Sequence, residues 1–563
     1  MPKLRKSNLE TIMAALFLYL FSGSMLFAET GVNDILRVPV ASQNKDFVED
    51  RVSKLHVPWL SVRKKQDIPP LSESDILAID KMENQGLLED IKSLRDGLPQ
   101  GKKILFISGD MGSIEGSRGD VVRMMAGCGV KLDWVFLEKS QDFKKAKLEK
   151  GLNKDFTGIE DKNATILNSA GKRTDFDAAM HDAVKSLVSM VTLSDYACVF
   201  LDDLFPLAMI PLIREKNPDI KIVWVCRRDI SRATDRAVAF LNEQLQGADS
   251  ATFWHPSLAP KGINAETIWL RHGINPLSLK NKKISRKNFK EKVLARYDIN
   301  PKMPYILHLG RFGVNKNHFL SLVCFKWMID DLKDKGVQTL PQLVLAGEEP
   351  KPGEQKDSFD RLNEFCEYLK LKDHVKILAL KFEGNERNNA LEVNALQSGA
   401  IFGVHPPHSE ALSLVVLEDG LKGTPVVATK RGGLGFQISR EEYLVDLPDD
   451  ESNKIRSLYW ELFIGKPDFK ALTRELEALK MPKILTQKML DLYNMHIGAG
   501  PMYSTLRKEN KGFIQDKFLV SQEVFESLLL VTRLMGIKSE ISEVNSNRID
   551  KMVLRLKSPQ YSL

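Results

Sequence analysis

Long apolar runs, each followed by a loop and a helical segment, are the feature that most restricts the fold of this chain. The first series begins near residue 103 with KKILFIS, a glycine-bearing loop up to Gly119, the short helix VVRMMAGCG and the run KLDWVFLE. Further runs are ACVFL at 197–201, KIVWVC at 221–226 and SATFW at 250–254. Uninterrupted apolar runs are typical of parallel strands covered on both faces. The pattern therefore predicts a doubly wound α/β sheet.

A second series of the same kind follows, with the runs YILHLGR, QLVLAGE, HVKILAL, AIFGVHP and TPVVAT. A chain of 563 residues exceeds what one hydrophobic core usually organises, so two such domains are expected, meeting near residues 274–300. After residue 440 we expect strands to stop and helices to dominate. The predicted parts are a targeting segment at 1–28, an N-terminal domain at 29–275, a C-terminal domain at 276–440, a helical extension at 441–535 that partly crosses back to the N-terminal domain, and a loose tail at 536–563.

The first 28 residues differ in kind from the rest. Lys3, Arg5 and Lys6 precede an apolar stretch from Ile12 to Ala28, which is typical of a signal peptide or a membrane anchor. The stretch is longer than a signal-peptide core and shorter than the roughly 20 residues of a comfortable span, and both readings stay open. The chain is thus expected to be exported, or membrane-associated through residues 12–28.

Charge and cysteine content exclude several classes of function. Lys plus Arg number 81 against 74 Asp plus Glu, and the charges are scattered, so the net charge of +7 indicates mild attraction to anionic ligands rather than a nucleic-acid surface. The five cysteines are widely spaced and form no CxxC pair, which indicates neither a metal site nor a disulfide framework. Cys198 and Cys226 lie in apolar runs, where a thiol acts as a small hydrophobe. Free thiols favour a reducing compartment and conflict with an exported first segment.

Two cations follow the run that opens the second series. Arg311 and Lys316 come directly after YILHLG and before the next helical segment. Ligands of an open parallel sheet bind outside the carboxyl ends of its strands, so both cations are expected at that crevice. There an Arg fork and a Lys point charge can neutralise a diphosphate. For the two residues taken alone, an ordinary solvated basic pair is the alternative.

The stretch HSEALSLVVLEDGLKGTPVVATKRGG places Glu410 and Glu418 with seven residues between them. A helix is expected to start near Leu412 or Ser413, so the free N–H groups around Ser413 and Leu414 offer an anion cradle at the same sheet edge as the two cations. Carboxylates beside a phosphate site can accept charge-assisted hydrogen bonds from sugar or ribose hydroxyls. The alternatives are an acid serving the helix dipole for Glu410 and a solvated helix-face charge for Glu418.

An R-x4-K pair after a strand, then E-x7-E followed by GTPVVAT and a glycine pair, resembles the nucleotide-sugar site of the retaining glycosyltransferase family four. The resemblance implies the GT-B fold, in which two Rossmann-like doubly wound domains, the first for the acceptor and the second for the donor, face across a cleft with a helical C-terminal region. It implies that the two cations hold the donor diphosphate, Glu410 the transferred sugar and Glu418 the ribose. Gly432 and Gly433 would form the donor-side turn.

The segments ALEVNALQSGAIF, GGLGFQI, INPLSLKNK, FLDDLFPLAMIPLI and VWVCRRDIS resemble the trehalose synthase and trehalose phosphorylase branch of that family. Where the synthases carry His-Asp-Pro this chain has Asp202, Asp203 and Leu204, and a Trp-Arg-Cys-His stretch is replaced by one that ends at Arg227. The EGFGL segment is EALSL here, which keeps its backbone N–H donors. The donor half therefore resembles the family closely, while the acceptor half has changed.

The loop GDMGSIEGSRG is expected to lie over the acceptor, with Ser117 and Arg118 as polar contacts, although a plain turn is the alternative. The adjacent acids of the LDD run and the arginine after VWVC belong to the same acceptor-side sheet. No DxD-type metal site lies at the donor strands, so neither a metal nor a cofactor is expected besides the nucleoside-diphosphate sugar donor.

The resulting hypothesis is a retaining, metal-independent hexosyltransferase that moves a hexose, glucose by resemblance, from a nucleoside-diphosphate sugar to a sugar acceptor. Phosphorolysis of an α-glucoside such as trehalose, with inorganic phosphate in the nucleotide's place, is the alternative enzyme. A degenerate sugar-binding protein without catalysis is the alternative of another class, which the altered acceptor half motivates. The sequence leaves the nucleobase, the acceptor and the oligomeric state open.

Overall fold

The computed structural model describes residues 58–541, apart from 65–67, 84–85, 110–116, 158–165, 168, 285–286, 381–385, 462–466, 499 and 539–540. The predicted targeting segment and most of the predicted tail lie outside the described residues. In the part of the chain that is described, no helix combines the length and apolar character needed to cross a membrane.

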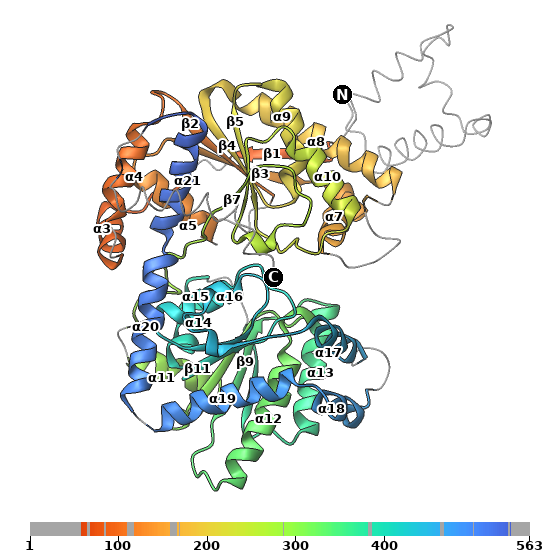
Figure 1. The fold of residues 1–563 in the computed structure, drawn as a ribbon, viewed down its shortest axis with the longest axis vertical. Helices are drawn as coiled ribbons and strands as arrows, with labels where there is room; N and C mark the ends of the chain where they lie inside the picture. Colours follow the sequence, from red (N-terminus) through yellow and green to blue (C-terminus); the bar gives the residue numbers. More distant parts are fainter. Residues whose placement is uncertain are drawn as a thin grey trace, which may run out of the picture. The chain divides into compact units, whose positions relative to one another are not determined.

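A seven-stranded sheet, with the helices packed on it, forms what we call the N-lobe (Figure 1). Its strand order is β1-β3-β2-β4-β5-β6-β7, and all neighbours are parallel except β1 and β3. The strands are β1 Leu60–Lys64, β2 Lys103–Ser108, β3 Leu132–Lys139, β4 Tyr196–Asp202, β5 Lys221–Cys226, β6 Ser250–Phe253 and β7 Thr267–Trp269.

A six-stranded parallel sheet forms the second unit, the C-lobe, in the order β10-β9-β8-β11-β12-β13. The expectation that strands stop at residue 440 was wrong by one two-residue strand, which pairs with the end of β12. The strands are β8 Tyr305–Leu309, β9 Gln342–Glu348, β10 Val375–Leu380, β11 Phe402–His405, β12 Val426–Thr429 and β13 Leu444–Val445.

Helices cover both faces of each sheet, as the uninterrupted apolar runs predict. Successive residues of β2 point into two separate cores: Leu105 and Ile107 pack with α8 and α10, whereas Ile104 and Phe106 pack with α4 and α5. The N-lobe helices are α3 Glu73–Met82, α4 Leu87–Asp96, α5 Ser117–Gly127, α6 Gln141–Ala146, α7 Leu148–Thr157, α8 Ala170–Met190, α9 Ile210–Lys216 and α10 Asp235–Leu245. The C-lobe helices are α11 Lys287–Arg296, α12 His318–Asp334, α13 Glu354–Tyr368, α14 Glu386–Gly399, α15 Leu414–Leu421 and α16 Leu434–Gln437.

The predicted helical extension also crosses back between the lobes. It consists of α17 Asp449–Glu461, α18 Phe469–Glu477, α19 Met481–Ile497, α20 Pro501–Lys517 and α21 Val520–Leu534. Helix α20 packs on α15 of the C-lobe, and α21 packs on α4 and α5 of the N-lobe. The chain passes between the lobes twice, first near Ile274 and again near residues 518–520, and we call these passages the first and second crossing. The two crossings contact each other: Ile274 N–H donates to Phe518 O at 2.8 Å, and Val520 N–H donates to Ile274 O at 3.0 Å.

Gly273 lies where the two crossings touch, so its substitution tests this contact. A Cβ at this position would stand 2.4 Å from Leu519 O, and the neighbours are backbone atoms with little room to move. We expect Gly273→Ala to lower the free energy of unfolding by about 1–3 kcal/mol, the usual cost of overpacking, measured as a lower urea midpoint by circular dichroism. Gly171→Ala in α8 is the control, since open space surrounds that position and no loss is expected. Equal midpoints for the two variants would contradict the tight crossing.

Candidate functional site

The two predicted cations lie in the turn after β8, as expected. Arg311 is exposed and Lys316 partly buried, and both line a cavity of about 350 Å³. Lys351, from the loop between β9 and α13, lines the same cavity and was not predicted. The guanidinium of Arg311 has no carboxylate partner among the described residues. This turn and the loop after β9 thus contribute three cationic side chains to one cavity, which suits a polyanionic ligand.

Hydrogen bonds fasten the turn after β8 to the loop after β11, the neighbouring strand. Asn315 Nδ2 donates to Ser409 O at 2.7 Å, and Asn317 Nδ2 donates to Pro406 O at 3.1 Å. The His408 N–H donates in return to Asn315 O at 3.0 Å. Asn317 adopts the left-handed backbone conformation with φ 60°, which asparagine tolerates better than most residues. The two loops therefore form one surface.

Lys316 reaches across this surface and pairs with Glu410 Oε2. The same oxygen lies 3.6 Å from His405 Nε2, and His405 Nε2 is 3.2 Å from Ser413 Oγ. Burial raises the pKa of Glu410, but the His405 hydrogen bond and the Lys316 charge outweigh it and hold that pKa below its ordinary value. Glu410 is therefore an ionised carboxylate with direct partners, rather than an acid that serves only the helix dipole.

Buried histidines lie next to these charged groups, and their imidazoles are neutral. Burial, and then the charge of Lys316, lower the pKa of His405, although Glu410 acts in the opposite direction. His308 and His318 stack at 3.9 Å between ring centroids, and burial lowers the pKa of His318 to about 3. The imidazoles add no positive charge at neutral pH, so the cationic charge at this edge comes from the lysines and Arg311.

The helix expected near Ser413 begins one residue later, at Leu414, with Ser413 as its N-cap residue. The side-chain amide of Gln437 forms two hydrogen bonds with the backbone of Ser413. The Ser413 N–H donates to Gln437 Oε1, and Gln437 Nε2 donates to Ser413 O, both at 2.9 Å. The prediction that the Ser413 N–H is free for an anion is therefore wrong. Leu414 opens the helix beyond this bond, and its part in an anion cradle stays a prediction.

Glu418 lies one turn into α15 and is 6% exposed, so the alternative of a solvated helix-face charge is wrong. Gln397 Nε2 lies 3.4 Å from its Oε2. Next to it, burial raises the pKa of Asp419 well above its ordinary value, with the Glu418 charge acting in the same direction. Burial thus favours the neutral form of Asp419.

Gly432 and Gly433 support the loop that carries Glu410. Gly432 has φ 53°, and a Cβ there would stand 2.1 Å from Glu410 O. A Cβ on Gly433 would stand 2.0 Å from Ala411 O, and the Gly433 N–H donates to Glu410 O at 3.0 Å. The glycine pair is needed because the backbone of the 410–411 segment lies directly against it.

On the N-lobe, three predicted acceptor-side residues form a buried charge cluster. Arg118 Nη2 and Arg227 Nε donate to Asp202 Oδ1 at 3.0 and 2.5 Å. Glu523 of α21 lies 3.8 Å from Arg118 and accepts from the Gly273 N–H at 2.8 Å. Arg118 and Asp202 are 1% and 3% exposed, so these side chains face each other in the interior. A contact with an acceptor stays a prediction for them.

The remaining acceptor-side predictions fall at the same strand ends. Asp203 adopts a left-handed conformation with φ 78°, and Arg228 Nε and Nη2 donate to its two carboxylate oxygens at 2.8 Å. Ser117 begins α5, two residues before the predicted end of the loop, and its side chain lies outside the described structure, as do residues 110–116.

Sequence reasoning missed His405, Gln437 and Lys351, which contact or adjoin the predicted site. His405 ends a predicted strand, which was a usable signal for a residue at the sheet edge. Gln437 belongs to the quoted segment GGLGFQI, but its contact with Ser413 spans 24 residues and follows no sequence spacing. Lys351 follows the run QLVLAGE, so its position at a strand end was the available signal.

Comparisons with known proteins place two families along this chain. The family described as trehalose synthase, N-terminal domain, matches residues 114–260, and the family described as glycosyl transferases group 1 matches residues 289–459. A trehalose synthase of Pyrococcus horikoshii is 27% identical over 250 residues, which cover 44% of this chain and 56% of the relative. A sulfoquinovosyl transferase of Arabidopsis thaliana is 29% identical over 243 residues, which cover 43% of this chain and 38% of the relative. The matched stretch thus spans about half the length of the curated relatives or less.

Solved structures share the fold at low sequence identity. The N-terminal domain of Candida albicans trehalose-6-phosphate phosphatase has a TM-score of 0.52 and 13% identity, covering 78% of this chain and 98% of that one. An E. coli structure, entitled trehalose-6-phosphate and bound with UDP-2-fluoro glucose, has a TM-score of 0.51 and 11% identity, covering 78% of this chain and all of that one. These likenesses, with the two sheets described above, confirm the predicted GT-B fold.

Gln437 provides a test of the helix cap beside the candidate site. Gln437→Met keeps the apolar volume but leaves the N–H of the buried Ser413 without its partner, while the Ser413 C=O keeps only the Leu417 N–H. We expect the free energy of unfolding to fall by at least about 1–3 kcal/mol, the cost of one buried unpaired group, measured as a lower urea midpoint. Gln487→Met on the exposed face of α19 is the matched control and should change little. An unchanged midpoint in Gln437→Met would contradict the role assigned to this amide.

Proposed function

Because the chain belongs to the GT-B glycosyltransferases, we propose that it moves a hexose, glucose by resemblance, from a nucleoside-diphosphate sugar to a sugar acceptor with retention of configuration. The observation that carries the proposal is the Lys316–Glu410 pair beside Arg311, held where the loops after β8 and β11 meet. A site for binding alone has no need of a carboxylate facing the phosphate-binding cations. The trehalose-synthase-like family match extends the proposal to a sugar acceptor.

In the proposed reaction the bond between the sugar C1 and the departing phosphate oxygen breaks, and a bond from C1 to the acceptor oxygen forms on the same face. The acceptor hydroxyl gives its proton to the departing phosphate. Arg311, Lys316 and the N-terminus of α15 stabilise the charge that develops on the diphosphate, so neither a protein nucleophile nor a metal is required. In the structure Lys316 is neutralised by Glu410, and the donor diphosphate would share that lysine when it binds.

Removal of either cation tests the diphosphate assignment. We expect Arg311→Ala and Lys316→Ala each to lower turnover by about two to three orders of magnitude, the usual loss for one transition-state charge stabiliser, with the fold retained. The assay uses the purified full-length chain with a panel of nucleotide sugars, with and without glucose. Arg440→Ala and Lys376→Ala are matched controls, since both cations pair with surface acids elsewhere on the C-lobe. Near-parental turnover in either test variant would show that the assignment is wrong.

The two glutamates are expected to differ in kinetics. Glu418, if it holds the ribose, contributes ground-state binding, so Glu418→Gln should raise the donor KM more than it lowers kcat. Glu410, if it holds the sugar as positive charge develops on the ring, acts in the transition state, so Glu410→Gln should lower kcat with little change in KM.

Both glutamate variants are measured with a nucleotide sugar and with glucose 1-phosphate. Glucose 1-phosphate has no ribose, so a parent that uses it and a silent Glu418→Gln would indicate phosphorolysis instead of transfer. Equal kcat losses in both variants with unchanged KM would refute the separate roles. A parent that turns over no donor would favour a sugar-binding protein.

A further inference from the structure

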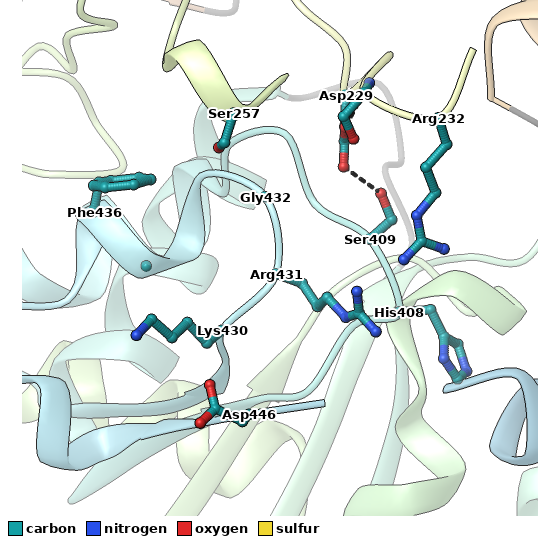
Figure 2. A pocket seen from close by; sticks show the side chains of 12 residues that line it. Asp229, Arg232, Ser257, His408, Ser409, Lys430, Arg431, Gly432, Phe436 and Asp446 are labelled. Carbon is teal, nitrogen blue, oxygen red and sulfur yellow. Dashed lines mark hydrogen bonds between the residues drawn. The ribbon is translucent and has the colours of Figure 1, made fainter. Parts of the chain in front are cut away.

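A second cavity lies on the far side of the segment that carries Glu410. Its volume is about 500 Å³, and its walls come from both lobes (Figure 2). The N-lobe contributes Asp229 and Arg232 from the loop after β5, and the C-lobe contributes His408 and Arg431. Ser409, which also lines the cavity, immediately precedes Glu410, so this space adjoins the candidate donor site without including Arg311 or Lys316.

The cavity is bordered by more arginine charge than the nearby acid neutralises. Arg232 Nη2 and Arg431 Nη2 both lie against Asp449 Oδ1, at 2.6 and 2.9 Å. The Asp449 side chain is 70% exposed, which weakens its hold on either guanidinium. Arg456 of α17 pairs with no carboxylate among the described residues; burial, and then the charges of Arg232 and Arg431, lower its pKa. Two guanidinium groups thus share one solvated carboxylate, and the charge of a third, Arg456, acts on both of them.

Buried polar atoms at this side of the cavity have no hydrogen-bond partner. The Nε of Arg431 and the Nε2 of His408 are both buried and unpaired, and His408 is 0% exposed. His408 Nδ1 is occupied by Ser452 Oγ at 3.3 Å. Figure 2 shows the His408 ring and the guanidinium groups of Arg232 and Arg431 gathered on the same side of the cavity. Buried polar groups without partners cost free energy, and here they belong to two of the residues that line the cavity.

Two further carboxylates, Asp229 and Asp446, line the cavity and interact with groups other than Arg232 and Arg431. Asp229 accepts hydrogen bonds from the N–H and Oγ of Ser231 at 3.1 and 2.6 Å and from Ser409 Oγ at 3.1 Å. Asp446 acts electrostatically on Lys430, away from the arginines. The side formed by His408 and the arginines therefore keeps its excess of positive charge.

We propose that this cavity binds a phosphoryl group carried by the acceptor sugar, with Arg232 and Arg431 holding its oxygens as forked donors. The inference rests on the proposed transfer reaction and specifies its acceptor class as a sugar phosphate. The cavity and the donor site are adjacent in the chain and in space. Ser409 and Gly432 line the cavity, while Glu410 follows Ser409 and its backbone packs on Gly432. A sugar whose phosphoryl group lies among the arginines would extend toward Glu410.

The test compares glucose with glucose 6-phosphate as acceptor, using the full-length chain and whichever nucleotide sugar it turns over. We expect a higher kcat/KM for glucose 6-phosphate, and a loss of about ten- to a hundredfold in that preference in Arg431→Gln and Arg232→Gln, as for one charge-assisted hydrogen bond. Arg440→Gln is the matched control and should keep the preference. Asp449→Asn removes the acid that now occupies both arginines, so it should tighten binding of inorganic phosphate measured by calorimetry.

The outcomes separate this inference from the proposed function. Donor turnover with equal kcat/KM for glucose and glucose 6-phosphate overturns the phosphoryl site and leaves the transferase assignment intact. Absence of turnover with every donor contradicts the transferase assignment, and calorimetry with inorganic phosphate then decides on the cavity. Phosphate affinity that falls in Arg431→Gln and rises in Asp449→Asn supports an anion site, whereas equal affinity in all variants overturns it.

Discussion

The pairing of β8 with β11 is the constraint on which the candidate site depends. Because the two strands are parallel neighbours, their following loops leave the sheet at the same edge although about 90 residues separate them in the chain. Hydrogen bonds from Asn315 and Asn317 then fix these loops to each other. Lys316 and Glu410 meet as a consequence, so the central ion pair is a product of sheet topology rather than of local sequence.

The glycine pair extends this arrangement to a third strand. Gly432 and Gly433 follow β12, and their lack of side chains lets the backbone of the 410–411 segment lie directly on them. The segment from His408 to Ala411 is thereby held from two sides. One face presents Glu410 to the cations after β8, and the other borders the cavity with Arg431. One short segment therefore couples the geometry of both spaces.

Sequence alone predicted the parts of this molecule that depend on chain order. The long strands were predicted because each is an uninterrupted apolar run, while the short edge strands β1, β7 and β13 carry too little pattern to be recognised. Arg311, Lys316 and Glu410 were predicted to meet at one edge because each follows a parallel strand, and the structure places them there, while their roles stay predictions. The bond between Gln437 and Ser413 was not found, since it depends on packing between α16 and α15. The buried contact of Arg118 with Glu523 joins residues about 400 positions apart, which no spacing in the sequence reveals.

That buried cluster also joins segments that are far apart in the chain where the two lobes are connected. Glu523 accepts from the Gly273 N–H and lies near the arginines that bind Asp202, so the first crossing, α21 and the end of β4 are joined by charge-assisted bonds. Breaking such a buried pair is strongly destabilising because it leaves a charge uncompensated. The burial that raises the pKa of Glu523 is outweighed by His272 and the two arginines, which keeps the carboxylate ionised. The two segments that connect the lobes are therefore held together at Ile274, Phe518 and Val520 by backbone bonds and beside them by this cluster.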